Sequence, residues 1–219
     1  MELVASEIVK LPEVETRQYG PGERLGGERL KRLHVYIRDG AVGLRLATGR
    51  STWALLEVFG PGRLLSPRLW QTPPGSESRH ATALLRTTTL ELPADVLEHE
   101  FAAHPPLALA VISLDACQQA GSLDRLAMLA LRDPLRRVAH TVLLLLERFS
   151  GEPGSAPSAR LEVGQELIAA FASLSRQTTN RQLRRLARAG VAAVKRRAVD
   201  VRDLGALRRV AGGRRSLGR

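Results

Sequence analysis

The stretch Leu174–Gly190, with the sequence LSRQTTNRQLRRLARAG, contains five arginines and no acidic residue. A solvated surface helix usually mixes signs, so that acids pair with bases along its length. Guanidinium groups bind phosphates, arginine can also hold guanine O6 and N7, and Gln or Asn can hold adenine N6 and N7. This composition therefore predicts a nucleic-acid-binding segment.

The residues around this stretch have the pattern of a helix-turn-helix. A first helix is expected from Gln165 to about Ala172, a turn at Ser173-Leu174, and a second helix for which Ser175 is a suitable N-cap. At about 100° per residue, one face of the second helix is apolar and the other is basic and amide-rich. The apolar face consists of Thr179, Leu183, Leu186 and Ala187, and the opposite face of Gln177, Asn180, Arg181, Arg184 and Arg188.

The apolar face should fix the second helix to its domain, which leaves the basic face for DNA. Side chains near the helix start can reach base edges, whereas Arg184, Arg185 and Arg188 lie further along and suit phosphates. After Gly190, VAAVKRRAVDVRD predicts a hairpin with Lys195–Arg197 near its tip, the wing of a winged helix. The candidate DNA-binding residues are Ser175, Arg176, Gln177, Thr178, Asn180, Arg181, Arg184 and Arg196.

The positive charge is concentrated in the same part of the chain. The formal charge of the 219 residues is +11; residues 1–150 hold 18 Lys and Arg against 17 Asp and Glu, and residues 151–219 hold 15 against 5. A general preference for arginine would not spare the first 150 residues. This asymmetry favours a polyanion-binding module joined to a nearly neutral domain.

The N-terminal part has the pattern of a small β-roll. From Tyr19 to about Leu92, short alternating runs are separated by glycine and proline turns. Asp39-Gly40 between two such runs predicts a hairpin, and Thr48-Gly49 and Gly60–Gly62 predict further turns. Two more strand-like segments, HATALL and TTTLEL, follow the polar loop QTPPGSES.

At Pro93 the spacing of apolar residues changes from that of strands to that of helices. A short helix that ends at Pro105-Pro106 is expected first, and a long helix from Leu107 to Leu131 follows it. The long helix carries residues at alternating spacings of three and four, the pattern of a coiled coil. This seam favours pairing of two chains, and the alternative is packing on the chain's own β domain. The seam consists of Leu109, Ile112, Ala116, Gln119, Leu123, Leu126 and Ala130, of which all but Ala130 are the candidate dimer-interface residues.

Asp133-Pro134 supplies an N-cap and a first-turn proline, so that another helix begins there. The sequence therefore predicts an α+β protein with three parts. These are a β-roll sensor-like domain at 1–104, a dimerisation helix at 105–132, and a winged helix-turn-helix DNA-binding domain at 133–219.

Several other classes of site and location are disfavoured. Cys117 is the only cysteine, which excludes an intrachain disulfide and a four-cysteine cluster. The apolar runs Leu107–Ile112 and Val142–Leu146 are too short to span a bilayer, and the chain start lacks the basic region of a signal peptide. We therefore expect a cytoplasmic, nucleoid-associated protein. No metal-ligand spacing occurs among His34, His80, His99, His104 and His140.

In order along nearly the whole chain, these features resemble the cyclic-AMP receptor protein (Crp/Fnr) superfamily of bacterial transcription regulators. The most specific match is Ser175–Arg181, SRQTTNR, which is similar to the family's Ser-Arg-Glu-Thr-Val-Ser/Gly-Arg recognition helix. The resemblance implies a cyclic-nucleotide-binding-like β-roll and a homodimer on a pseudo-palindromic site. It assigns base reading to Arg176, Gln177 and Arg181. Gln177 departs from the usual glutamate, and Ser173 stands where the turn usually has glycine.

The resemblance also locates a degenerate effector pocket. Pro67 replaces the glutamate that binds ribose in cyclic-nucleotide-binding members. Arg79 is retained at the position of the phosphate partner. Without a ligand, its side chain would be exposed or paired with an acid such as Glu77. Ser122-Leu123 stands where those members use a polar pair to read adenine. The candidate pocket residues are Arg79, Ser66 and Ser122, and we expect no cofactor and no dependence on cyclic AMP.

Three classes of function remain to be compared. The first is a sequence-specific dimeric transcription regulator that works with RNA polymerase, either independently of cyclic AMP or through a diverged cyclic-nucleotide pocket. The second is a non-specific nucleoid-type DNA-binding protein, which would not need amide side chains at the start of the recognition helix. The third is an enzyme; no glycine-rich phosphate loop, Ser/His/Asp order or carboxylate pair supports it, and we expect no enzymatic activity.

Overall fold

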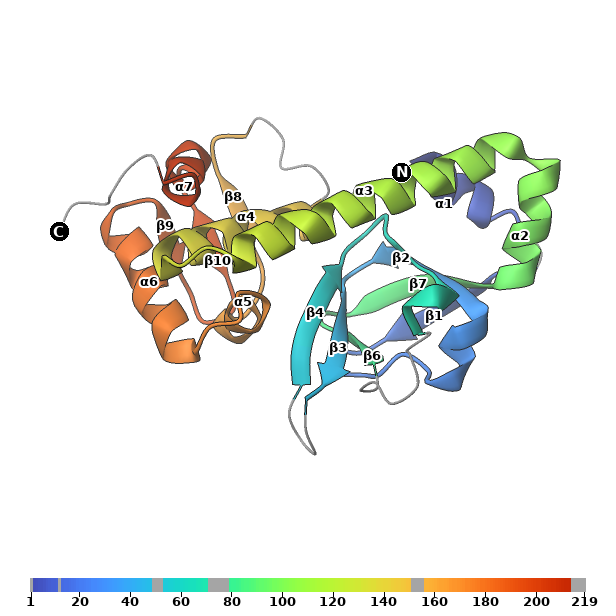
Figure 1. Cartoon of the computed structure of the whole chain (residues 1–219), viewed down its shortest axis with the longest axis horizontal. Helices are drawn as coiled ribbons and strands as arrows, with labels where there is room; N and C mark the ends of the chain where they lie inside the picture. The colour runs from blue at the N-terminus through green and yellow to red at the C-terminus, as the bar shows by residue number, and fades with distance from the viewer. Residues whose placement is uncertain (1, 12, 49–52, 71–78, 151–155, 214–219) are drawn as a thin grey trace. The chain divides into compact units, whose positions relative to one another are not determined.

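The computed structural model describes residues 2–11, 13–48, 53–70, 79–150 and 156–213 (Figure 1). The chain divides into two compact units, Met1–Gly121 and Ser122–Arg219. The first unit contains α1 (Glu2–Ile8), β1 (Glu15–Tyr19), η1 (Glu28–Arg32), β2 (Leu33–Asp39), β3 (Val42–Ala47), β4 (Trp53–Phe59), β5 (Leu64–Leu65), η2 (Pro67–Trp70), β6 (Arg79–Ala83), β7 (Thr87–Pro93) and α2 (Ala94–Ala103).

The long helix α3 (Pro105–Leu129) runs from the first unit into the second. The second unit then contains α4 (Pro134–Ser150), β8 (Ala159–Leu161), α5 (Gln165–Phe171), α6 (Arg176–Arg188), β9 (Ala192–Val194), β10 (Val199–Val201) and α7 (Leu204–Ala211). The α+β fold with an N-terminal β-roll and a C-terminal winged helix-turn-helix is confirmed.

The first unit is a β-roll made of two antiparallel sheets, with strand orders β1-β7-β2-β5 and β4-β3-β6. Their inner faces share one core, to which β2 contributes Val35 and Ile37 and β3 contributes Val42 and Leu44. The outer face of the first sheet packs against residues of α1, α2 and the start of α3. In β2, Val35 and Ile37 face the core shared by the two sheets while Tyr36 faces the helices, because successive side chains of a strand point to opposite faces of the sheet.

The hairpin predicted at Asp39-Gly40 is wrong. Strand β2 pairs with β7 and β5, whereas β3 pairs with β4 and β6, so this turn carries the chain from one sheet to the other. Gly40 has φ of +85°, and a Cβ there would lie 2.3 Å from the carbonyl oxygen of Arg86. Thr87 Oγ1 accepts from the Ala41 amide and donates to the Ala41 carbonyl, which holds the corner against β7. A glycine turn between apolar runs suits this crossover as well as a hairpin.

The next predicted hairpin is confirmed by the antiparallel pairing of β3 with β4. Gly49 of the predicted turn and Glu77, the acid suggested as a partner of Arg79, lie outside the described residues. Strand β1, which the sequence analysis did not predict, pairs along its length with β7. It is largely polar, so it lacks the apolar alternation on which strand prediction depends.

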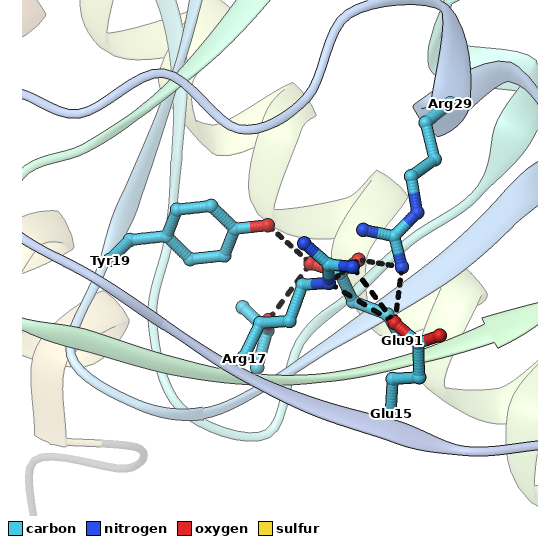
Figure 2. A network of polar contacts seen from close by, with 6 residues as sticks. Glu15, Arg17, Tyr19, Arg29 and Glu91 are labelled. Atoms are coloured by element: carbon cyan, nitrogen blue, oxygen red, sulfur yellow. Dashed lines mark hydrogen bonds and ion pairs between the residues drawn. The ribbon is translucent and has the colours of Figure 1, made fainter.

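A buried carboxylate explains why β1 is polar. The Glu91 side chain, 1% exposed, accepts from the Tyr19 hydroxyl at 2.5 Å and pairs with Arg29 at 3.1 Å (Figure 2). Arg17 lies 3.6 Å from the same carboxylate. Burial, followed by the hydrogen bond to Glu91, raises the pKa of Tyr19. The cluster joins β1 and η1 to β7, and the arginines offset the cost of burying the charge.

The helices after the β-roll begin close to their predicted starts. Helix α2 ends before His104, and α3 begins at Pro105 because proline is tolerated in the first turn. Asp133 caps α4 through a hydrogen bond from the Leu135 amide to its Oδ1, as the Asp133-Pro134 pair predicts. The division between the units falls inside α3, N-terminal to the predicted boundary at Asp133.

A buried arginine accounts for the position of that division. Arg125, on α3, donates to the carbonyl oxygen of Phe171 at 3.2 Å, and its Cζ lies 4.5 Å from the Phe171 ring centroid. Met128, one turn further, is buried and its sulfur accepts from the Thr141 hydroxyl. The last two turns of α3 therefore pack with α4 and α5 as part of the second unit.

Candidate nucleic-acid interface

The second unit combines a three-stranded sheet, β8-β10-β9, with helices α4 to α7 (Figure 1). Helices α5 and α6 form the predicted helix-turn-helix. Ser175 caps α6 because its Oγ accepts from the Thr178 amide at 3.1 Å, and the same Oγ donates to Thr178 Oγ1 at 2.9 Å. The capping prediction for Ser175 is confirmed.

The turn before α6 contains the left-handed residue suggested by the family pattern. Ser173 has φ of +51°, a region in which a side chain costs free energy and glycine does not. Its amide donates to the carbonyl of Ala170, and the Leu174 amide donates to that of Ala169. The turn therefore keeps its geometry with serine in the glycine position.

The two faces of α6 are separated as predicted. Thr179, Leu183 and Leu186 are completely buried. On the other side, six residues have exposed side chains, namely Arg176, Gln177, Arg181, Arg184, Arg185 and Arg188. The apolar contacts hold α6 on α4, α5 and β9, so the guanidinium groups are presented to solvent.

Helix α5 contacts the start of α6 through two polar pairs that the sequence analysis did not identify. Asn180 Nδ2 donates to Gln165 Oε1 at 2.8 Å, and Arg176 Nη2 lies 2.7 Å from Glu166 Oε1. Asn180 is half-buried, unlike the exposed Gln177 and Arg181. The polar character of positions 165 and 166 was visible in the sequence, but no periodicity links them to α6.

The hairpin β9–β10 forms the predicted wing. The Lys195 amide donates to the Ala198 carbonyl at 2.8 Å and closes the tip, where Arg196 and Arg197 are exposed. Lys195 Nζ lies 2.7 Å from Asp200, and this hydrogen bond lowers the pKa of Asp200. Strand β8 pairs with β10 and widens the wing sheet.

The candidate effector residues do not form one site within either unit. Ser66 and Arg79 belong to the first unit and Ser122 to the second. Arg79 is exposed, and its Nη1 donates to the carbonyl of Leu69 at 3.1 Å, in the short helix that begins with Pro67. Pro67 offers neither a carboxylate nor an N–H. Among the described residues, Pro67 and the carbonyl-bound Arg79 do not supply the ribose and phosphate contacts that the resemblance implies.

The seam of α3 is exposed. Leu109, Ile112, Leu123 and Leu126 have relative exposures of 66%, 63%, 65% and 60%. Ala116, Gln119 and Ala130 are also exposed, whereas Leu107, Leu114 and Met128, on another face, are buried. Within the first unit, the part of the seam from Leu109 to Gln119 does not pack against the β-roll, which was the alternative considered above.

The described residues contain no group of His, Cys, Asp and Glu that could hold a metal ion. His34, His80 and His140 each have a pKa below the ordinary value, mainly because burial disfavours the imidazolium form. His104 instead contacts Glu100 at 2.9 Å. Within the part of the chain that the structure describes, no helix combines the length and apolar character that a membrane span requires.

Comparison with known proteins agrees with this architecture. Residues 136–210 match the model of the Crp-like helix-turn-helix domain. Over 178 residues, the chain is 28% identical to the CRP-like cAMP-activated global transcriptional regulator of Mycobacterium tuberculosis, covering 81% of this chain and 78% of that protein. These two findings support a regulator of the Crp/Fnr superfamily.

Solved structures share the Crp/Fnr fold along almost the whole chain. A cyclic nucleotide-binding domain containing protein from Listeria monocytogenes superposes with a TM-score of 0.77 at 16% identity, covering 94% of this chain and 98% of the other. FixK2 from Bradyrhizobium japonicum superposes with a TM-score of 0.72 at 19% identity, covering 90% of this chain and 96% of FixK2. These likenesses show the fold, and the Crp-like helix-turn-helix domain rests on the family model that matches residues 136–210.

Proposed function

We propose that this regulator acts as a homodimer that binds a pseudo-palindromic DNA site in a sequence-specific manner. The single observation that carries the proposal is the two-faced helix α6. Its buried Thr179, Leu183 and Leu186 fix the helix, while Arg176, Gln177 and Arg181 are exposed near its start. These residue types at the N-terminal part of a recognition helix suit base edges in the major groove.

The remaining candidate residues take other parts in DNA binding. Arg184 and Arg188, further along α6, suit phosphates, as does Arg196 at the wing tip. Ser175 and Thr178 hold the helix start through the capping contacts and can reach phosphates from there. Asn180, proposed from the sequence as a base reader, binds Gln165, so we assign it to holding the two helices together.

Dimerisation follows from the exposed seam of α3. Four large apolar side chains along one helix would lose their contact with water if a second copy paired with them in the manner of a coiled coil. A symmetric dimer places two recognition helices about 34 Å apart, so that half-sites recur one helical turn apart.

The proposed regulator does not depend on cyclic AMP. The M. tuberculosis relative is described as cAMP-activated. In this chain, however, Pro67 has replaced the ribose-binding carboxylate and Arg79 is bound to the Leu69 carbonyl. We further propose that the protein is cytoplasmic and acts on transcription together with RNA polymerase at the nucleoid.

Selection of bound DNA in vitro from a random library, with and without cyclic AMP, tests the proposal. We expect enrichment of one pseudo-palindrome, with an affinity ratio over random DNA of ~10³ or more, unchanged by the nucleotide. Enrichment of no sequence would instead establish a nucleoid-type binder. Enrichment only in the presence of cyclic AMP would establish a nucleotide-responsive regulator with a diverged pocket.

A further inference from the structure

We infer that Glu166, in the first turn of α5, is a positioning residue that sets the DNA specificity of the regulator through Arg176. This inference rests on the proposed base-reading function of α6. It concerns a residue of the first helix of the motif and not of the recognition helix. The relevant observation is the ion pair between Glu166 Oε1 and Arg176 Nη2, 2.7 Å apart.

The neighbouring contact restricts the same arginine. Gln165 and Glu166 are consecutive on α5, while Arg176 and Asn180 are one turn apart on α6. Gln165 binds Asn180 at 2.8 Å, beside the pair formed by Glu166 and Arg176. Two parallel contacts thus join the starts of the two helices, and the guanidinium of Arg176 is held before DNA arrives.

The pair has little value for folding, because both side chains are largely exposed, 76% for Arg176 and 70% for Glu166. Exposed ion pairs of this kind contribute little to stability. An arginine that is already oriented, however, loses less conformational freedom when it binds a base in a bidentate manner. Glu166 therefore favours DNA sites at which Arg176 can form its bidentate contact with guanine.

The carboxylate also acts against the wrong DNA. A negative charge beside the recognition helix is repelled by phosphates, and this repulsion applies to every sequence. This repulsion is compensated only at a DNA site where Arg176 can bind its base. Glu166 thus weakens non-specific binding more than specific binding, which is how repulsive elements create specificity.

Glu166→Gln tests the inference, because it removes the charge and keeps the size of the side chain. We expect binding to random DNA to strengthen by roughly twofold to fivefold, and discrimination at the base read by Arg176 to fall by roughly fivefold or more. In an Arg176→Ala background, the loss of discrimination caused by Glu166→Gln should disappear.

The matched control is Glu162→Gln. Glu162 is also 70% exposed and pairs with an arginine, Arg160 at 2.8 Å, but this pair lies on and next to β8. The control should leave base discrimination unchanged. If Glu166→Gln keeps full discrimination at every position, or weakens specific and random DNA equally, the inference is overturned although the wild type still selects a site. If the wild type selects no site, the proposed function itself has failed.

Discussion

At the scale of single residues, the same side chain performs different tasks according to its surroundings. Arg125 is buried and joins α3 to the carbonyl of Phe171, and Arg29 neutralises the buried Glu91. Arg181 is exposed on the recognition helix, with its side chain directed to solvent. A buried arginine such as Arg125 is not available to DNA, and we therefore propose base-reading roles only for residues on the exposed face of α6.

Arg181→Ala should lower affinity for the selected site by ~1–3 kcal/mol and affect random DNA much less, because a bidentate base contact is lost. Titration of labelled duplexes at fixed salt measures both affinities. Arg208→Ala, an exposed arginine on α7, is the control and should change neither strongly. Equal losses on both kinds of DNA would show that Arg181 binds phosphates only.

Ser173→Gly should stabilise the second unit by about 1 kcal/mol, because φ of +51° is strained for serine and free of strain for glycine. Ala170→Gly, at an exposed position in the last turn of α5, is the control and should destabilise the second unit by about 0.5–1 kcal/mol. Calorimetric unfolding of both variants gives the comparison. A destabilising Ser173→Gly would mean that the turn does not strain its serine.

At the scale of elements, α3 has two apolar faces with different partners. One face, with Leu107, Leu114 and Met128, is buried within the chain, and the other, from Leu109 to Leu126, is exposed. A helix that is hydrophobic on two sides needs two partners. The second copy of the chain that we propose supplies the missing one.

Leu126→Asp should weaken dimerisation, and with it binding to the full site, because a charge would be placed in an apolar seam. Sedimentation velocity over a range of concentrations measures the monomer–dimer equilibrium. Cys117→Asp adds the same charge at an exposed position of α3 outside the seam and should leave the dimer intact. A wild-type protein that is monomeric at all concentrations would remove the dimer from the proposal.

At the scale of the whole molecule, histidine burial makes the β-roll sensitive to pH. Burial lowers the pKa of His34 below 6.5, opposed by Glu98, and lowers that of His80 with further effect from Arg24 and Arg45. The unfolded chain takes up protons at an ordinary histidine pKa, whereas the folded chain resists them. Stability is therefore full above about pH 6.5 and falls as the pH drops below it.

Trp53 and Trp70, the only tryptophans, both lie in the first unit, so their fluorescence reports its unfolding. The urea midpoint should be lower at about pH 5.5 than at about pH 7.5. His34→Gln should reduce this difference, whereas replacement of the exposed His99 by Gln should not. A midpoint that is the same at both pH values would contradict the assignment.

The sequence by itself determined those elements whose apolar and capping residues lie at regular, short spacings along the chain. The amphipathic α6, its Ser175 cap, the wing hairpin and the start of α4 at Pro134 were all predicted, because each depends on residues within a few positions of one another. Strand β1 was missed because its polar residues gather around Glu91, 72 or more positions from them.

Tertiary structure alone decided which elements meet. At Gly40 the chain crosses from one sheet to the other. Arg125 contacts Phe171, 46 positions away, and Glu166 pairs with Arg176. No period in the sequence encodes such contacts, because they depend on how whole elements pack. The sequence therefore predicted which residues could bind DNA, while packing determined which of them are exposed and which contact a neighbouring side chain.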